Sequence, residues 1–219
     1  MYKILMLEDD QYLLFQYEDA LNDVGFFVDA ETNIRKFYNK ATTSDYDAIV
    51  CDMALPADDF IDNLESMGGW RTGLALCKKI RSHGSDAKLI ALTNSDLSEA
   101  AEWFSQDESV AYCSKVNYPP LEFAIALKRI LDNPDIPLGE LEETDTLQHR
   151  ILVARNNIPN TNNEIIERLD QIIETLKSSD TKSFKSSVTD FLSLAANISG
   201  IISSIPALME LISSLSKLF

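Results

Sequence analysis

The chain has 219 residues, of which 45% are hydrophobic and 25% charged, and its formal net charge is −16. This is an ordinary globular composition. The acidic excess extends over both parts of the chain without a cluster of Lys and Arg, so we expect no nucleic acid among its partners. Three cysteines without metal-type spacing, and an N-terminus too acidic for a signal peptide, favour a cytoplasmic location.

The first 133 residues alternate between short apolar runs and amphipathic patterns. Apolar runs predict strands over 4–7, 26–29, 48–51, 89–92 and 110–113, and the segments between and after them predict helices over 11–24, 33–41, 70–82, 96–106 and 120–132. Such an alternation predicts an α/β fold with a mostly parallel sheet covered on both faces. Functional residues are then expected where the strands end at their carboxyl side.

The chain changes character after residue 133. Two prolines and a glycine between 132 and 139 predict a helix stop and a linker. The apolar residues of 163–177 fall on one helical face, and no strand signal follows residue 133. We therefore expect a domain over 1–133, a linker with a possible short helix over 134–160, and an all-α hairpin or bundle over 161–219.

The end of the chain carries a heptad pattern, in which Pro206 is expected to kink or break the helix. In the main interpretation, two amphipathic helices pack on each other or on a second copy, so 161–219 mediates self-association or binds a protein partner. In the alternative, the uncharged segment 191–209 inserts in or lies on a membrane, although it contains Asn197 and Gly200. The predicted seam consists of Phe191, Leu194, Ile198, Ile201, Ile205, Leu208, Ile212, Leu215 and Phe219.

Polar residues follow four of the five predicted strands. Glu8 and Asp9 follow the first strand, Asp52 the third, Thr93 the fourth and Lys115 the fifth. Clustered carboxylates repel one another unless a cation lies among them, and oxygen ligands suit Mg²⁺. An aspartate can attack a phosphoryl group and form an acyl phosphate. That transfer needs mainly positioning and neutralisation of the phosphoryl oxygens, which Mg²⁺, an ammonium and a hydroxyl would supply.

The segments around these residues resemble the signature segments of response regulator receiver domains. They read LMLEDD at 5–10, IVCDMALP at 49–56, IALTNSD at 90–96 and AYCSK at 111–115. The resemblance implies a flavodoxin-like (βα)5 fold with a parallel five-stranded sheet, followed here by the all-α module. It also implies Mg²⁺ as cofactor and a sensor histidine kinase or phosphotransfer protein as partner. The chain would be no enzyme beyond catalysing its own phosphorylation.

The same resemblance implies a role for each site residue. Asp52 would be the phosphoacceptor, and phosphorylation would control the helical module or, in the alternative, gate a membrane-active effector. The Mg²⁺ ligands would be Glu8, Asp9, Asp52 and the backbone carbonyl of Ala54, with Asp9 the more direct of the acidic pair; the phosphate-binding and switch residues would be Lys115, Thr93 and Tyr112.

Two departures from the family pattern leave questions open. Val116 follows Lys115 where receivers usually have a proline joined by a cis peptide bond, so this loop is either trans or cis at a cost of about 3 kcal/mol. The segment 57–70 is longer than usual and contains four acids. It is either a solvated loop or a lid or partner-selecting element beside Asp52.

Overall fold

The computed structural model covers residues 1–219. It describes every residue except 57, 62–70, 95–102, 104–108, 134, 137, 139–145, 160–161, 198–201, 203 and 219. The predicted helix over 96–106 and most of the 57–70 segment therefore lie outside the described residues.

A five-stranded parallel sheet forms the centre of the first part of the chain. The strand order is β2-β1-β3-β4-β5, which is the flavodoxin-like order, as predicted. Every neighbouring pair runs parallel, and strands β1, β3 and β4 are almost entirely buried because helices cover both faces. The strands are β1 (Lys3–Leu7), β2 (Phe27–Glu31), β3 (Ala48–Cys51), β4 (Lys88–Thr93) and β5 (Val110–Ser114).

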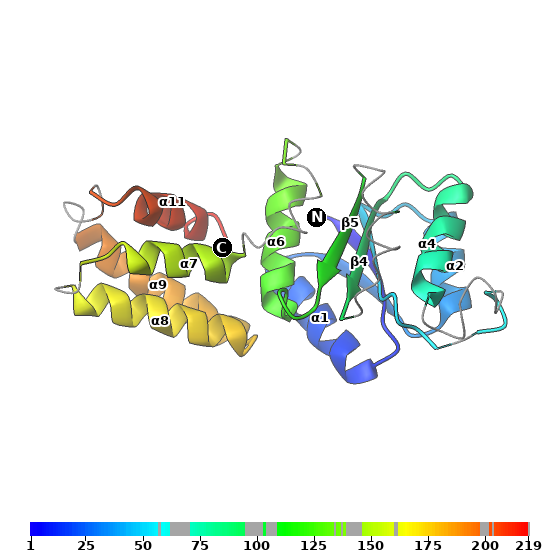
Figure 1. Cartoon of the computed structure of the whole chain (residues 1–219), viewed down its shortest axis with the longest axis horizontal. Helices are drawn as coiled ribbons and strands as arrows, with labels where there is room; N and C mark the ends of the chain where they lie inside the picture. The colour runs from blue at the N-terminus through cyan, green and yellow to red at the C-terminus, as the bar shows by residue number, and fades with distance from the viewer. Residues whose placement is uncertain are drawn as a thin grey trace.

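Helices α1 and α6 cover one face of the sheet, and α2 and α4 cover the other (Figure 1). Their bounds agree closely with the prediction: α1 is Gln11–Val24, α2 is Ile34–Thr43, α4 is Thr72–Ser82 and α6 is Pro120–Asp132. Local chemistry sets the ends of α1. The side chain of Asp10 accepts hydrogen bonds from two amides of the first turn, and Gly25 ends the helix at φ 100°, in the left-handed region that glycine adopts without strain.

Among the residues that the structure describes after α6, four helices pack on one another: α7 (Leu147–Asn156), α8 (Asn163–Lys177), α9 (Thr181–Asn197) and α11 (Pro206–Leu215). Figure 1 shows them as one group on the outer side of α6, so that α6 lies between them and the sheet. One continuous apolar core runs from Ile4 of the sheet through Phe123 of α6 to Ile151 of α7 and Leu215 of α11. Helix α7 lies within 134–160, where we expected a linker with a possible short helix.

The predicted heptad seam is divided between two helices. Helix α9 ends at Asn197, and α11 begins at Pro206 after an extended Ile205, at φ −125° and ψ 94°. Proline has no amide to donate and favours an extended residue before it, so Pro206 begins a new helix, and the predicted seam is interrupted before it as expected. Phe191 and Leu208 are buried within the chain, whereas Ile198 and Ile201 lie outside the described residues. Among the helices that the structure describes, none has the length and apolarity needed to span a membrane.

Candidate functional site

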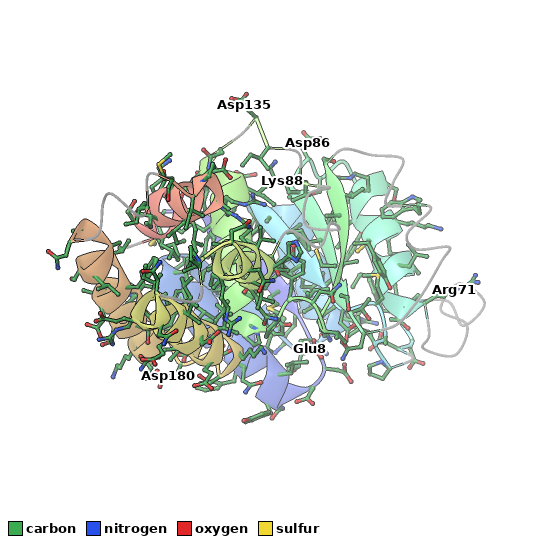
Figure 2. All side chains as sticks on the ribbon, turned by 60° about the vertical axis from the view of Figure 1, so that its left-hand side comes forward. Glu8, Arg71, Asp86, Lys88, Asp135 and Asp180 are labelled. Atoms are coloured by element: carbon green, nitrogen blue, oxygen red, sulfur yellow. The ribbon has the colours of Figure 1, made fainter. Side chains whose placement is uncertain are left out.

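The carboxyl ends of the strands bring together side chains from three separate segments. Glu8 follows β1, Asp52 follows β3 and Lys115 follows β5. Figure 2 shows Glu8 at the end of the sheet opposite to Asp86 and Lys88, which lie where β4 begins. The predicted clustering of these residues at one edge of the sheet is therefore observed.

A buried ammonium joins two buried carboxylates at this edge. The Nζ of Lys115 lies 2.6 Å from Oε2 of Glu8 and 2.7 Å from Oδ2 of Asp52. All three side chains are at most 7% exposed. An ammonium buried with two carboxylates makes strong charge-assisted hydrogen bonds, because water does not compete for them. Lys115 thus contacts Asp52 directly through Oδ2.

A third carboxylate completes a potential metal site. One oxygen each from Glu8, Asp9 and Asp52 lies within 4.8 Å of the others, and Asp9 is exposed to solvent. This donor set consists of oxygen atoms alone, and it is open on the side of Asp9, where water can complete the coordination. It therefore fits a hard cation that keeps part of its water shell, such as Mg²⁺. The residue Ala54, predicted as a carbonyl ligand, is exposed beside Asp52.

One ammonium, that of Lys115, faces the two carboxylates of Glu8 and Asp52, and the pKa shifts of Glu8 and Lys115 reflect this imbalance. Burial, the largest cause, and the charge of Asp52 raise the pKa of the Glu8 carboxyl, and the hydrogen bond from Lys115 lowers it, so that the net value is about 7. Burial opposes the charged form of Lys115, but its contacts with Asp52 and Glu8 outweigh this and raise the pKa of the ammonium. A metal ion at this edge would therefore stabilise the ionised form of Glu8.

The backbone around Asp52 is held from both sides. Its amide donates to the carbonyl of Leu7 at 3.1 Å, and its Oδ1 accepts a hydrogen bond of 3.1 Å from the amide of Ala54. At the start of α4, the amide of Gly73 donates to the carbonyl of Met53 at 3.2 Å. A Cβ atom on Gly73 would lie only 2.0 Å from the carbonyl oxygen of Asp52. Sequence reasoning missed Gly73, because its signal is only an isolated glycine near a predicted helix start.

The two predicted switch residues lie on neighbouring strands. Thr93, at the end of β4, is buried, and its carbonyl accepts a hydrogen bond of 3.0 Å from the amide of Lys115. Tyr112 of β5 is partly buried against the core formed with α2 and α4. The peptide bond between Lys115 and Val116 is trans, which answers the question left open by the missing proline.

Residues 58–61, the described part of the long acidic segment 57–70, contact helices α2 and α4. The ring of Phe60 lies 5.0 Å from that of Tyr38 on α2. The cations of Arg35 and Lys79 lie 5.6 Å and 5.1 Å from the centre of the same ring. Asp58 caps this turn by accepting a hydrogen bond of 2.7 Å from the amide of Phe60. These contacts place the ring of Phe60 against α2 and α4.

A second buried carboxylate connects the sheet domain to the C-terminal helices. Glu122, in the first turn of α6, is 2% exposed. Its Oε1 accepts hydrogen bonds from the amide of Leu147 and, at 3.3 Å, from that of Gln148. These amides begin α7, where backbone donors lack partners within the helix. Sequence reasoning missed this contact, because nothing in the local pattern of Glu122 points to a partner 25 positions away.

Comparison with known proteins finds one family and several solved structures that are similar to this chain. The family pattern described as response regulator receiver domain matches residues 4–119. Among solved structures, a receiver domain protein from Methanospirillum hungatei is 18% identical, with a TM-score of 0.48 over 60% of this chain and 94% of its own. The chemotaxis protein CheY4 of Vibrio cholerae is 20% identical, with a TM-score of 0.47 over 59% and 98%. A two-component response regulator from Clostridium difficile is 23% identical, with a TM-score of 0.47 over 62% and 100%.

Proposed function

Because this chain belongs to the response regulator receiver domain family, we propose that it takes a phosphoryl group on Asp52 and thereby controls its own C-terminal helices. Receiver domains are signalling modules that accept phosphoryl groups from histidine kinases or phosphotransfer proteins. The observation that carries the proposal is the contact of Lys115 with both Asp52 and Glu8 at the carboxyl edge of the sheet.

The chemistry of the proposed step follows from the position of these side chains. A carboxylate oxygen of Asp52 attacks phosphorus as the bond to the donor imidazole breaks, and the imidazole leaves with the bonding electrons. Glu8, Asp9, Asp52 and the carbonyl of Ala54 would hold Mg²⁺ in the acidic pocket where receiver domains bind it, and the bound ion neutralises charge on the phosphoryl oxygens. Lys115 already lies at Asp52 and turns from Glu8 toward the new phosphoryl group.

The neighbouring strands supply the proposed switch. The hydroxyl of Thr93 would donate to a phosphoryl oxygen, because Thr93 ends the strand between those of Asp52 and Lys115. Movement of Thr93 changes the space next to β5, so Tyr112 would turn inward. These two residues pass the change at Asp52 to the loop between β5 and α6.

The route from this loop to the C-terminal helices is short. Only Val116–Pro119 separate Lys115 from α6, and Glu122 in the first turn of that helix accepts hydrogen bonds from the start of α7. We propose a receiver over 1–133, a connecting segment over 134–160 and an output module over 161–219. A shift of Glu122 would loosen α7, on which the module packs through α8 and α11. The apolar residues of the module could then bind a second copy or another protein partner.

Hydrogen exchange tests this proposal directly. Beryllofluoride with Mg²⁺, which imitates the phosphoryl group, should speed exchange of the first amides of α7. The same treatment of the Asp52→Asn variant should leave them unchanged. Unchanged exchange in both proteins would contradict control of the module by the receiver.

A further inference from the structure

The position of Lys115 depends on the loop that carries it, which spans residues 115–119 between β5 and α6. Val116 is 78% exposed, so its side chain packs against little of the protein. A proline at this position would restrict the backbone through its ring, whereas valine leaves that rotation free. Hydrogen bonds therefore have a larger part in fixing this loop.

Several hydrogen bonds fix the start of the loop. The amides of Asn117 and Tyr118 donate to the carbonyl of Ser114, at 3.1 Å and 3.0 Å. The amide of Lys115 donates to the carbonyl of Thr93 on β4 at 3.0 Å. These bonds form a turn and attach its first residue to the sheet. They do not attach the end of the turn to a helix.

Tyr17 of α1 holds the end of this turn. Its hydroxyl donates to the carbonyl of Tyr118 at 2.7 Å, and the two residues are 1% and 2% exposed. A hydrogen bond is stronger in the protein interior than at the surface, because water does not compete for it. Burial, the largest cause, raises the pKa of Tyr17, so the hydroxyl keeps its proton and remains a donor.

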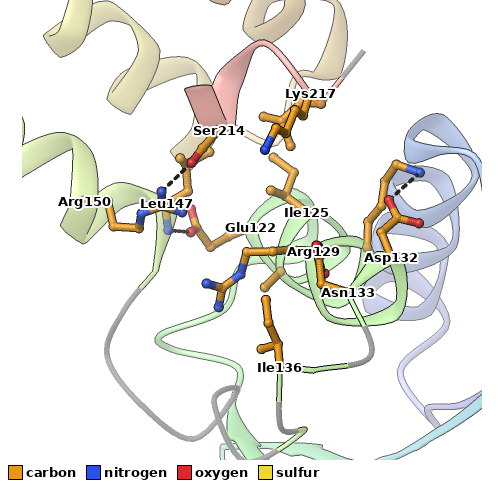
Figure 3. Close-up of a pocket in the computed structure, with 13 residues that line it drawn as sticks. Glu122, Ile125, Arg129, Asp132, Asn133, Ile136, Leu147, Arg150, Ser214 and Lys217 are labelled. Carbon is orange, nitrogen blue, oxygen red and sulfur yellow. Dashed lines mark hydrogen bonds and ion pairs between the residues drawn. The ribbon is translucent and has the colours of Figure 1, made fainter. Parts of the chain in front are cut away.

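The same tyrosine connects the loop to two further parts of the structure. Helix α1 begins two residues after Asp9, so Tyr17 belongs to the element that directly follows the acidic pair Glu8 and Asp9. Its ring lies 5.8 Å from that of Phe123, edge to face, in the first turn of α6. Phe123 follows Glu122, whose carboxylate faces the start of α7 (Figure 3). Tyr17 thus links the helix after the acidic pair, the loop and α6.

We propose that Tyr17 is a positioning residue for Lys115, and this inference rests on the proposed phosphorylation of Asp52. The hydrogen bond from Tyr17 to Tyr118 keeps the loop closed on α1. The closed loop keeps the ammonium of Lys115 at Oδ2 of Asp52 and Oε2 of Glu8. Without the hydroxyl the loop opens more often, and the ammonium leaves the two carboxylates. Because Tyr17 donates to a backbone carbonyl of the loop, it acts on the reaction through the lysine.

Titration of the full chain with Mg²⁺ tests this role without a phosphoryl donor. The ammonium of Lys115 competes with the metal for Glu8 and Asp52, so Lys115→Met should bind Mg²⁺ about tenfold more tightly. Tyr17→Phe removes only the hydroxyl and should bind Mg²⁺ about threefold more tightly than the unmodified chain. In the double variant, Tyr17→Phe should add nothing to the effect of Lys115→Met. Calorimetry measures the dissociation constants of all four proteins.

The rate of phosphorylation gives a second readout. Tyr17→Phe should slow the labelling of Asp52 by acetyl phosphate about fivefold, because Lys115 no longer stays where it neutralises the phosphoryl oxygens. Tighter Mg²⁺ binding together with slower labelling distinguishes a positioning role. A residue that only stabilised the fold would lower the metal affinity and the rate together.

Tyr2→Phe is the matched control. The hydroxyl of Tyr2 donates to the carbonyl of Leu131, near the other end of α6, also at 2.7 Å. Its loss should lower the free energy of unfolding to a similar extent as Tyr17→Phe does. It should leave the Mg²⁺ affinity and the rate of labelling unchanged, because Tyr2 does not hold the loop of Lys115.

Unchanged or weaker Mg²⁺ binding in Tyr17→Phe would overturn the assignment. An undiminished effect of Tyr17→Phe in the Lys115→Met background would overturn it too, because the tyrosine would then act without the lysine. If the unmodified chain accepts no phosphoryl group on Asp52, the proposed function fails. The titration with Mg²⁺ still decides the role of Tyr17 in that case, so the two failures are distinguishable.

Discussion

The Nζ of Lys115 lies 2.7 Å from Oδ2 of Asp52, although the two residues are 63 positions apart. Both side chains are only 7% exposed. A buried ammonium and carboxylate in this contact stabilise each other's charged form, and removal of one leaves the other without a partner. The consequences of this relationship can be measured.

We expect Asp52→Asn to abolish phosphorylation by acetyl phosphate in the presence of Mg²⁺, because an amide cannot attack phosphorus as a carboxylate does. Intact-mass spectrometry measures the added phosphoryl group. Asp10→Asn is the matched control, since Asp10 is an exposed carboxylate two residues from Glu8 and asparagine caps a helix equally well. Equal labelling of the unmodified chain and both variants would show that another residue accepts the phosphoryl group.

We expect Lys115→Met to lower the free energy of unfolding by about 3 kcal/mol, because Glu8 and Asp52 then face each other without a cation. Mg²⁺ should restore part of this loss by binding to the folded state alone. Thermal unfolding with EDTA and with Mg²⁺ measures both effects. Lys36→Met removes an exposed lysine of α2, and it should change neither the free energy of unfolding nor the effect of Mg²⁺ on it. If Mg²⁺ stabilises Lys115→Met no more than it stabilises the unmodified chain, the result would argue against a metal site at these carboxylates.

We expect Gly73→Ala to lower the free energy of unfolding by about 3 kcal/mol and to slow phosphorylation, because its Cβ would lie 2.0 Å from the carbonyl oxygen of Asp52. Gly25→Ala is the control. Nothing lies within 4 Å of its added Cβ, so only its φ of 100° opposes the change, at about 1 kcal/mol. Chemical denaturation and phosphorylation rates should separate the two variants, with Gly25→Ala labelled at the normal rate.

We expect Glu122→Ala to expose the first amides of α7 and to raise their exchange rate about tenfold, because their buried acceptor is lost. Glu122→Gln should keep most of the protection, since its amide oxygen still accepts. Glu167→Ala, an exposed acid of α8, should have no effect on α7. If Glu122→Ala leaves these amides protected, then Glu122 does not hold the module on the receiver.

We expect the isolated segment 1–133 to be monomeric, and the full chain to self-associate when beryllofluoride and Mg²⁺ are bound. The apolar residues of α9 and α11 that are buried within the chain become available when the module loosens. Light scattering measures the mass in each state. Asp52→Asn should remain monomeric under the same conditions. A full chain that stays monomeric throughout would leave a different protein as the partner of 161–219.

The sequence by itself determined the sheet, its covering helices and the place of the site. Apolar runs and helical periodicity located all five strands, and four of the five predicted helices lie within the described residues close to their predicted bounds. Because parallel strands share one carboxyl edge, Glu8, Asp52 and Lys115 had to meet there whatever the details of packing. Pro206 likewise interrupts the predicted seam for a local reason, because its ring removes the amide donor and restricts the residue before it.

The tertiary structure alone decided how the C-terminal helices are used. The described residues of the predicted seam lie on α9, on α11 and just before α11, and they are buried or partly buried within the chain. Helix α6 contacts the start of α7 through Glu122. The local sequence does not reveal the roles of Glu122 and Gly73, because these roles depend on atoms of Leu147 and Asp52 that are remote in sequence. Periodicity reports which face of an element is apolar, whereas the partner of that face depends on how whole elements pack together.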